Sequence, residues 1–447
     1  MPQYLSPGVY VEEVASAVQP IAGVGTSTAG FVGRVADDVV MPAQPGRFVT
    51  DAAGRVTLDQ NGKPTPVPFV VAPAGEPQLI TSWEQFKNAF GDFQIAPPAP
   101  VPATPAAVTT PAAADAGTTP AATGTTTKPK AATPATVADV SLRNRTLAHA
   151  VYGFFNNGGT RCWVTRVLGA GSPTDVQAAL DGFKAIDEIA LVIVPGATDD
   201  VTQKMVVEHC KGMGDRFAIL DGSQTDTLTV AGIAGGTGTS DYAAMYFPWI
   251  SVWDPSRNKV DFVPPSGHIA GIFARVDGSR GVHKAPANEV VRGAVGLQKR
   301  LSIADQNGLN PDGINLIRDF GGDIKVWGAR TLGGDANGEW KYVNVRRLFL
   351  FLRKSIDHGT HWVVFEPNTP ALWAKITRNI VAFLTNVWRD GALFGATPQE
   401  AFYVKCDAST NPPELRDLGQ VVTEIGVAVV RPAEFVIFRI SQWQPGA

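Results

Sequence analysis

Polar and apolar residues form a repeating pattern through the middle of this 447-residue chain. From residue 139 onward, segments with apolar positions three and four residues apart alternate with short runs that are apolar throughout, such as Ala190 to Val194. The first pattern predicts amphipathic helices, and the second predicts strands that are buried on both faces. Because this alternation is typical of a parallel sheet with helices on either side, we predict an α/β domain in the middle of the chain.

The last third of the chain is richer in large apolar side chains. Tyr342 to Ile356 is apolar nearly all round, which predicts a helix covered on more than one side. The pattern then predicts a strand at His361 to Phe365, a helix at Pro370 to Arg389, and strands at Ala401 to Asp407 and Val421 to Val430. We therefore expect a second domain of mixed helices and strands.

Each end of the chain carries a strand pattern that has no hairpin partner nearby. At the N-terminal end, a Pro7-Gly8 turn precedes Val9, Tyr10, Val11 and Glu12. At the C-terminal end, Glu434 to Ser441 reads EFVIFRIS, and its alternating positions are Phe435, Val436, Ile437, Phe438 and Arg439. Each segment could add to a sheet of its own subunit, or it could pair with another chain.

Two segments interrupt the regular pattern. The segment 41–75 is hairpin-like and has an Asn61-Gly62 turn between extended halves. The segment 96–138 contains mainly Pro, Ala and Thr, which cannot bury enough apolar surface to form a core, so we expect a disordered loop. We interpret both segments as insertions.

The predicted fold class is multidomain, α/β and α+β, with extended β-strand arms at both termini. A length of 447 residues favours two or more domains. The predicted parts are an N-terminal arm at 1–21, an α/β domain with a parallel sheet at 22–325, a mixed domain at 326–432 and a C-terminal arm at 433–447.

Composition excludes several classes of protein. The net charge of −3 argues against nucleic-acid binding, which normally requires a basic surface. Cys162, Cys210 and Cys406 are far apart and lack metal-ligand spacing, so we expect buried thiols rather than a zinc site or disulfides. The start of the sequence lacks a signal-peptide pattern, and no apolar run is long enough to span a membrane, which predicts synthesis in the cytoplasm.

A polar cluster in the central stretch is the strongest candidate for catalytic chemistry. Turn-forming residues surround it, and its members are Arg275, Asp277, Arg280, His283 and Lys284. An α/β enzyme or ligand-binding protein could place an active site in this 264–290 loop. No nucleophile and base have the spacing of a catalytic motif, so we favour a structural role in which the cluster holds an irregular backbone in place.

Other single residues carry weaker signals. Asp221 ends a predicted strand, where open sheets bind ligands, but a lone Asp there is more often a turn or cap residue. His358 and His361 have no evident third metal ligand. We predict no catalytic residue, no cofactor and no metal.

Several stretches of the sequence resemble the tail sheath subunits of contractile phages and phage-like contractile injection systems. They include YLSPGVYVEEV, IAGVGTSTAGFVG, PPSGHIAGIFARVDGSRGVHKAPANE, LNPDGINLIRDF, YVNVRRLFLFLRKSI, FEPNTPALWAKI and RPAEFVIFRISQ. The resemblance covers most of the chain and is lost in the Pro-rich stretches after Val40 and Ile95.

The resemblance implies a structural subunit rather than an enzyme. Both terminal arms would cross to neighbouring subunits and complete a shared sheet, with hinges near Gly23 to Gly30 and near Arg431-Pro432. Subunits would stack in hexameric rings as a helical sleeve around an inner tube, with baseplate and terminator proteins as further partners and no nucleic acid or membrane insertion. Assembly is expected in the bacterial cytoplasm, and a phage-like injection system is favoured over a phage virion tail.

Overall fold

The body of the protein is built around one large sheet. The computed structural model describes residues 20–93, 144–168 and 172–439. The sheet has nine strands in the order β11-β14-β13-β8-β7-β6-β1-β5-β4. Its six inner strands run parallel from β13 to β5, as the sequence predicts, whereas β4, β14 and β11 pair antiparallel at the edges. The strands are β1 Ala29–Arg34, β4 Gln78–Ile80, β5 Cys162–Val167, β6 Leu191–Ile193, β7 Phe217–Asp221, β8 Ala243–Phe247, β11 Glu289–Val290, β13 Ile314–Phe320 and β14 Asp323–Val326.

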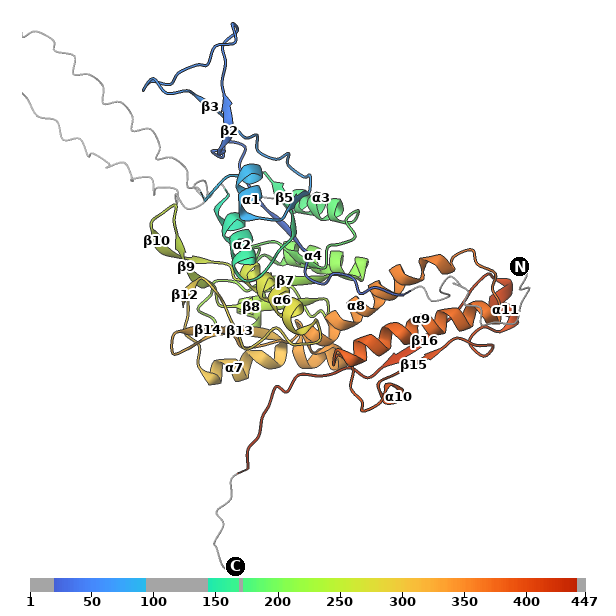
Figure 1. The fold of residues 1–447 in the computed structure, drawn as a ribbon. Coiled ribbons are helices and arrows are strands. Elements are labelled where there is room, and N and C mark those ends of the chain that lie inside the picture. The colour runs from blue at the N-terminus through green and yellow to red at the C-terminus, as the bar shows by residue number, and fades with distance from the viewer. Residues whose placement is uncertain (1–19, 94–143, 169–171, 440–447) are drawn as a thin grey trace, which may run out of the picture.

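Helices cover both faces of this sheet (Figure 1). On one face, α2 (Arg145–Asn156) and α6 (Ser266–Arg280) contribute Phe154 and Phe273 to a core that includes Phe31. On the other face, α3 (Pro173–Phe183) and α4 (Asp200–Met213) form a second buried cluster. Two apolar layers around a central sheet are the expected result of strands that are apolar on both sides. The shorter helices of the body are α1 Trp83–Phe90, α5 Val230–Ala234, α7 Ile303–Leu309 and η1 Asn310–Asp312.

The prediction of an irregular backbone at 264–290 is wrong, because α6 occupies Ser266–Arg280. Gly267 and Gly271 let α6 approach α2 closely. A side-chain Cβ at these two positions would lie 2.3 Å and 2.4 Å from backbone oxygens of α2. Glycine disfavours helices in isolation, so the pattern indicates a loop until the tertiary packing is known.

Two small β structures extend from the body. β9 (Ile250–Asp254) lies between β10 (Lys259–Val263) and β12 (Ala294–Leu297). β2 (Ala43–Phe48) pairs antiparallel with β3 (Pro66–Pro68) in a hairpin that protrudes from the body (Figure 1). The Pro/Ala/Thr segment expected at 96–138 lies outside the described residues.

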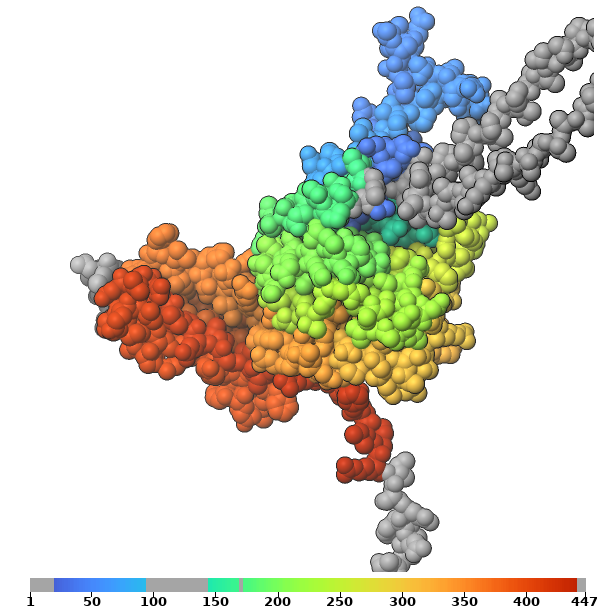
Figure 2. All heavy atoms as spheres, turned by 180° about the vertical axis from the view of Figure 1, so that it is seen from behind, coloured from blue at the N-terminus to red at the C-terminus, as the bar shows by residue number. Residues whose placement is uncertain are grey.

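The C-terminal part forms an elongated projection to one side of the body, whereas the hairpin protrudes at the top (Figure 2). Two long helices, α8 (Val343–Thr360) and α9 (Pro370–Arg389), pack into a separate core that includes Leu348 and Leu384. β15 and β16 form a two-stranded antiparallel sheet beside them. The remaining elements are η2 Gly334–Trp340, η3 His361–Val363, α10 Pro398–Ala401, β15 Phe402–Lys405, α11 Pro413–Asp417 and β16 Glu424–Val427.

Two strand predictions in this part need correction. The apolar run at His361–Phe365 is not a strand, because the chain forms η3 and then turns through a positive φ of 68° at Phe365 toward α9. The strand expected at 421–430 is shortened to β16. The expected domain boundary after residue 325 stays a prediction, although Val326 still belongs to β14 and Leu332 packs in the core of the body.

Candidate assembly interface at the two chain ends

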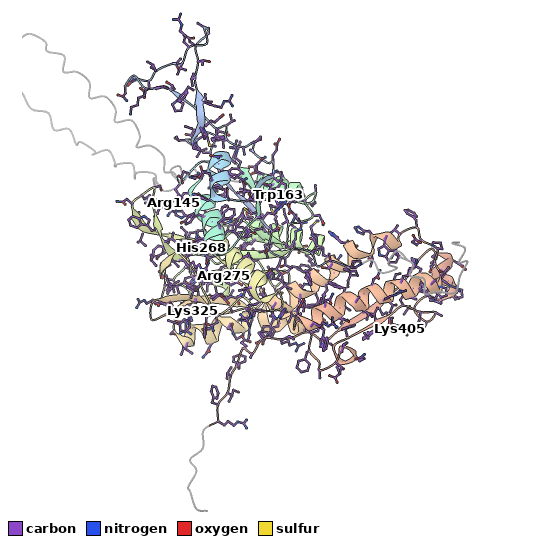
Figure 3. The ribbon with its side chains drawn as sticks, viewed as in Figure 1. Arg145, Trp163, His268, Arg275, Lys325 and Lys405 are labelled. Carbon is purple, nitrogen blue, oxygen red and sulfur yellow. The ribbon has the colours of Figure 1, made fainter. Side chains whose placement is uncertain are left out.

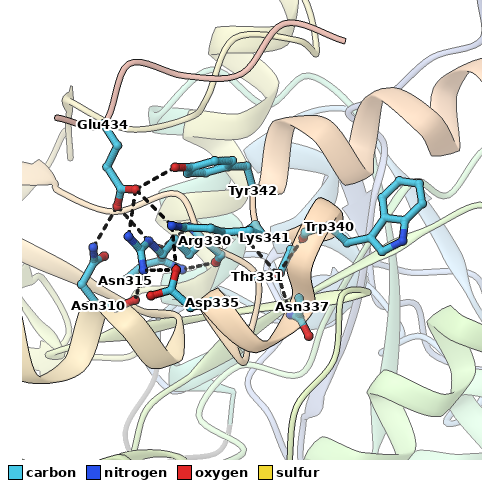
Figure 4. A network of polar contacts seen from close by, with 10 residues as sticks. All are labelled: Asn310, Asn315, Arg330, Thr331, Asp335, Asn337, Trp340, Lys341, Tyr342 and Glu434. Atoms are coloured by element: carbon cyan, nitrogen blue, oxygen red, sulfur yellow. Dashed lines mark hydrogen bonds and ion pairs between the residues drawn. The ribbon is translucent and has the colours of Figure 1, made fainter. Parts of the chain in front are cut away.

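The C-terminal segment is fixed to the body at one residue, Glu434. Its carboxylate oxygens accept hydrogen bonds from Arg330, with Nε to Oε1 at 2.8 Å and Nη2 to Oε2 at 2.9 Å. The side chains of Asn310 and Tyr342 donate to the same carboxylate at 2.8 Å and 2.9 Å (Figure 4). Such bidentate, charge-assisted bonds are stronger and more directional than neutral ones, so they define where this segment leaves the body.

The polar groups around Glu434 stabilise its charged form. Burial alone would raise the pKa of Glu434, but hydrogen bonds from Arg330, Asn310 and Tyr342 outweigh burial and lower that pKa. Arg330 is itself buried and also contacts Asp335, at 3.2 Å. The network therefore holds an ionised carboxylate at neutral pH.

Beyond Glu434 the chain is apolar and exposed. Phe435, Val436, Ile437 and Phe438 are each between 68% and 83% exposed. Within the described residues, 434–439 form no strand with their own subunit, and 440–447 lie outside that part of the chain. A strand needs a partner for its backbone groups, so pairing of Phe435 to Arg439 with another chain stays a proposal.

The N-terminal segment contacts helix α8 and the projection. Ile21 is buried in the core of the projection, and the backbone N–H of Val24 donates to Oγ of Ser355 on α8 at 3.1 Å. The hydroxyl of Thr26 donates to Oδ2 of Asp277 at 2.6 Å. The predicted arm residues Val9 to Glu12 lie outside the described residues, so their pairing stays a prediction.

Asp277 has an ion-pair partner that the sequence did not indicate. Arg347 on α8 contacts both carboxylate oxygens of Asp277, at 2.9 Å and 2.6 Å, and donates to the backbone oxygen of Thr26 at 2.9 Å. Both side chains are almost fully buried, and the guanidinium also lies 4.7 Å from the ring centre of Phe273. Asp277 therefore joins α6, α8 and the N-terminal segment.

The other members of the predicted cluster do not converge on Asp277. Arg275 lies on α6 within the body (Figure 3) and donates to the backbone oxygens of Asn157 and Val290 at 3.1 Å and 2.8 Å. Lys284 donates to the backbone oxygens of Ala285 and Ala287 at 2.5 Å and 3.2 Å, and burial lowers its pKa. These bonds connect neighbouring segments of the backbone.

The last two members of the predicted cluster are His283 and Arg280. His283 contributes its backbone oxygen, which accepts a hydrogen bond from Asn344, whereas the side chain of Arg280 is exposed at the end of α6. The five side chains therefore do not surround one reactive position. Their structural role stays a proposal, and the contacts favour it over the alternative of an active site at 264–290.

Asp221 lies at the end of β7 and contacts the first residue of α6, Ser266. Its carboxylate accepts hydrogen bonds from the backbone N–H and the hydroxyl of Ser266, at 2.8 Å and 2.6 Å, and from the N–H of Gly196 at 2.9 Å. Burial raises the pKa of Asp221 to about 6, although these bonds act in the opposite direction. The carboxylate therefore stabilises the first turn of α6 by accepting hydrogen bonds from Ser266.

The described part of the chain contains no group of three or more His, Cys, Asp or Glu side chains arranged to hold a metal ion. In the same part, no helix is both long enough and apolar enough to cross a membrane. The three thiols predicted to be buried are buried and unpaired.

A folded body with an exposed apolar segment, fixed at its root by buried charges, defines a subunit of a larger protein assembly. The family model described as phage tail sheath protein central domain matches residues 169–332, and the model of the phage tail sheath C-terminal domain matches residues 335–442. The chain belongs to the phage tail sheath protein family.

Individual relatives agree with this assignment. The tail sheath protein of Burkholderia phage BcepMu is 25% identical over 311 residues, which span 65% of this chain and 63% of that protein. The helical sheath of the anti-feeding prophage (AFP) in its contracted state is 27% identical, with a TM-score of 0.67, and the match covers 98% of this chain and 99% of that chain. The sheath of the extracellular contractile injection system PVC in its contracted state is 26% identical, with a TM-score of 0.66, and the match covers 99% of both chains.

Proposed function

We propose that this chain is the repeating subunit of a contractile sheath, joined to its neighbours by strand addition at both chain ends. The observation that carries the proposal is the segment after Glu434, which is apolar, exposed and unpaired within the described residues, yet fixed at its root by Arg330. Alternating side chains can bury both faces of such a segment once a neighbour supplies a sheet edge.

β15 and β16 offer a receiving sheet. They form a sheet of only two strands in the described part of the chain, so each has an outer edge available to an added strand. Strand addition of this kind contributes about 1 kcal/mol net for each backbone hydrogen bond. When each subunit contacts the next through two different surfaces and the resulting ring does not close, the subunits form an open helix. An open helix of subunits is the geometry of a sleeve.

We further propose that the sleeve consists of hexameric rings around an inner tube, and that it starts from a baseplate and ends at a terminator protein. Contraction of the sleeve would drive the tube through a target envelope. An injection system is favoured over a phage virion because the AFP and PVC sheaths are 27% and 26% identical to this chain and match along 98% or more of it.

Helix α9 suits contact with the tube. Lys375, Arg378 and Arg389 lie three and eleven residues apart, which places them on one face over about 21 Å of helix. All three are exposed, α9 contains no acidic residue, and no ion pair within the described residues neutralises them. A basic face of this kind fits an acidic wall of the tube.

Truncation of the arms tests the sleeve. Deletion of residues 1–17 or 435–447 should leave a folded subunit that no longer polymerises, because the body has its own core, Glu434 and its bonds to Arg330 are kept, and only the inter-subunit strands are lost. Electron microscopy of cells that make the whole particle measures this directly. Normal sleeves from either truncated chain would rule out strand addition at that end.

Charge reversal tests the orientation toward the tube. The double variant Lys375→Glu with Arg378→Glu should still polymerise, but the sleeves should lack tubes or lose them at moderate salt. Reversal of Arg300, an exposed cation of the body, serves as the control.

A further inference from the structure

The β2–β3 hairpin (residues 43–68) contains an eight-residue repeat. The sequence VTDAAGRVT at 49–57 continues as TLDQNGKPT at 57–65, so Asp51 is equivalent to Asp59 and Gly54 to Gly62. In the structure, Oδ1 of Asp51 accepts two backbone hydrogen bonds at 2.9 Å, and Oδ1 of Asp59 accepts two at 2.8 Å and 2.9 Å. The two glycines have φ of 77° and 74°. The repeat therefore forms two turns of the same geometry.

The extended segments between these turns close into a ring. The N–H of Val49 donates to the backbone oxygen of Thr65 at 2.8 Å, and the N–H of Thr57 donates to that of Val49 at 2.8 Å. The N–H of Thr65 donates to the backbone oxygen of Thr57 at 2.9 Å and completes the ring. Each of the three segments therefore bonds to the other two, which fixes the directions of their side chains.

One face of this ring is apolar. Residues opposite each other in an antiparallel pair point to the same face, and so do residues two apart in one strand. The opposite pairs are Phe48 with Pro66, Thr50 with Val56, and Leu58 with Pro64. The two rules place all six side chains on one face, where the large apolar ones are between 44% and 61% exposed. Antiparallel strands normally direct polar side chains to solvent, so this face has the character of a contact surface.

The charged side chains of the hairpin lie at its turns. Arg55 and Lys63 follow the two turns, are exposed, and form no ion pair within the described residues. Together with Arg47 they make three cations against two carboxylates in the hairpin, although the whole chain has a net charge of −3. An apolar face opposite a mainly basic one is the pattern of a segment that lies on an anionic membrane surface.

The size and the position of the apolar face favour a lipid surface over a protein. Its three large apolar side chains are far fewer than the roughly 20 residues that each side of a stable protein interface contributes. A bilayer needs no complementary shape, and contacts that are weak singly add up over many copies. The hairpin also stands apart from the projection and from the C-terminal segment (Figure 1, Figure 2), so strand addition would leave it uncovered.

We propose that the apolar face of the β2–β3 hairpin attaches the assembled sleeve to an anionic lipid bilayer. Phe48, Val56 and Leu58 would lie at the boundary between headgroups and acyl chains, and the long side chains of Arg55 and Lys63 would reach the headgroups. The proposal rests on the proposed function, because it needs many hairpins on one sleeve. A single subunit would bind weakly, whereas a sleeve would bind tightly. The hairpin would lie on the bilayer without crossing it.

Flotation with protein-free vesicles tests the proposal. Sleeves purified from cells that make the whole particle are mixed with vesicles of phosphatidylcholine containing about one third phosphatidylglycerol. Parent sleeves should float with the vesicles, and free subunits should not. Val56→Thr combined with Leu58→Thr should lower the floating fraction at least about tenfold, because the apolar face loses two large side chains while threonine still favours a strand. Val201→Thr combined with Ile303→Thr is the matched control, since both residues are exposed apolar residues of the body, and it should float like the parent.

A second variant changes the charge and leaves the apolar face in place. Arg55→Glu combined with Lys63→Glu should weaken flotation with the anionic vesicles, and most strongly at low salt. Parent sleeves should also float less with vesicles of phosphatidylcholine alone. The two variants disturb the hairpin in different ways, so a folding defect in one of them does not decide the result.

The outcomes separate this proposal from the proposed function. Equal flotation of the parent and the Val56→Thr, Leu58→Thr variant would overturn the proposal, and so would parent sleeves that do not float. If either hairpin variant no longer forms sleeves, the face contacts another sheath subunit and the proposal is wrong. If the parent subunit forms no sleeves in electron micrographs, the proposed function fails and this proposal with it, and that result appears before any vesicle is added.

Discussion

Arg330 and Glu434 lie 104 positions apart in the sequence, and their side chains form a two-point contact at 2.8 Å and 2.9 Å. Arg330 is 3% exposed and Glu434 is 20% exposed, so the contact is shielded from solvent. Arg330→Met should destabilise the subunit by about 3 kcal/mol, because it leaves the Glu434 carboxylate without its main partner. Urea unfolding measures the loss, and limited proteolysis should show faster cleavage after residue 434.

Glu434→Gln is the milder companion variant, since its amide retains the shape and one acceptor oxygen. We expect a loss of about 1 kcal/mol for this change. A double-mutant cycle with Arg330→Met should give a coupling energy above about 1 kcal/mol. Additive effects of the two changes would show that the contact does not stabilise the root of the arm.

Asp277 and Arg280 share a helix but should respond differently to substitution. Asp277→Ala leaves the buried Arg347 unpaired and also removes the bond from Thr26, so we expect a loss of about 3 to 5 kcal/mol or a failure to assemble. Arg280→Ala removes an exposed side chain and should change stability by less than about 0.5 kcal/mol. Thermal unfolding and electron microscopy measure the two effects. If both variants melt and assemble like the parent while the particle is inactive, the cluster belongs to an unrecognised site.

The Pro/Ala/Thr insertion should be dispensable for folding. The two described segments that flank it are held together, because Nδ2 of Asn144 donates to the backbone oxygens of Phe90 and Asp92 at 2.9 Å and 2.7 Å. A deletion of residues 96–136 therefore only shortens a connection whose ends already meet, and closure entropy depends weakly on its length. We expect a change in melting temperature of at most about 2 °C, and normal sleeves. Loss of sleeves would identify the insertion as a contact element.

Two buried histidines make the subunit sensitive to acid. Burial lowers the pKa of His209 to about 4 and that of His268 to about 3, whereas an unfolded histidine titrates near 6.5. Between pH 5 and 6 the unfolded chain therefore binds two more protons at these residues than the folded chain does. Asp221 acts in the opposite direction, because its pKa is raised to about 6, so its contribution to stability is lost as the pH rises through that value.

These three groups leave a net difference of about one proton, and His283, whose pKa burial also lowers, acts in the same direction as the two histidines. Stability should therefore rise by at least about 1.4 kcal/mol per pH unit from pH 5 to 6. Denaturant unfolding at several pH values measures this slope. His209→Gln removes one histidine contribution, so the slope of this variant should be lower than that of the parent by about 1.4 kcal/mol per pH unit. An unchanged slope would show that His209 is protonated in the folded subunit.

Sequence patterns predicted the features that depend on neighbouring residues. The parallel core of the sheet and the helices on both sides follow from apolar runs and helical spacing in single segments, such as Ala190 to Val194. The run at His361 to Phe365 misled the prediction, because a short apolar run does not by itself distinguish a strand from a turn, and here the chain forms a turn that leaves Val364 and Phe365 exposed. Helix α6 was missed because Gly267 and Gly271 disfavour a helix except where another helix packs closely against it.

The candidate site depended on contacts that no local pattern contains. The sequence indicated Asp277 but not Arg347, which lies 70 residues away on α8. Glu434 was included in the predicted C-terminal strand, but its partner Arg330 belonged to no motif. A charged residue near a predicted arm is a usable signal for an anchor, although only the fold identifies its partner.

Both end segments contact the first turns of one helix, α8, and the N-terminal segment also contacts Ser355 farther along it. Tyr342 directly precedes α8 and donates to Glu434, whereas Arg347 in the second turn of α8 holds Thr26 and Asp277. A pull on one arm would therefore reach the other through α8, between Tyr342 and Ser355, without crossing the nine-stranded sheet. The body would then carry little of the force between the two arms. Extra segments in the body, including the β2–β3 hairpin, would therefore enlarge the subunits of a sleeve without weakening the contacts between them.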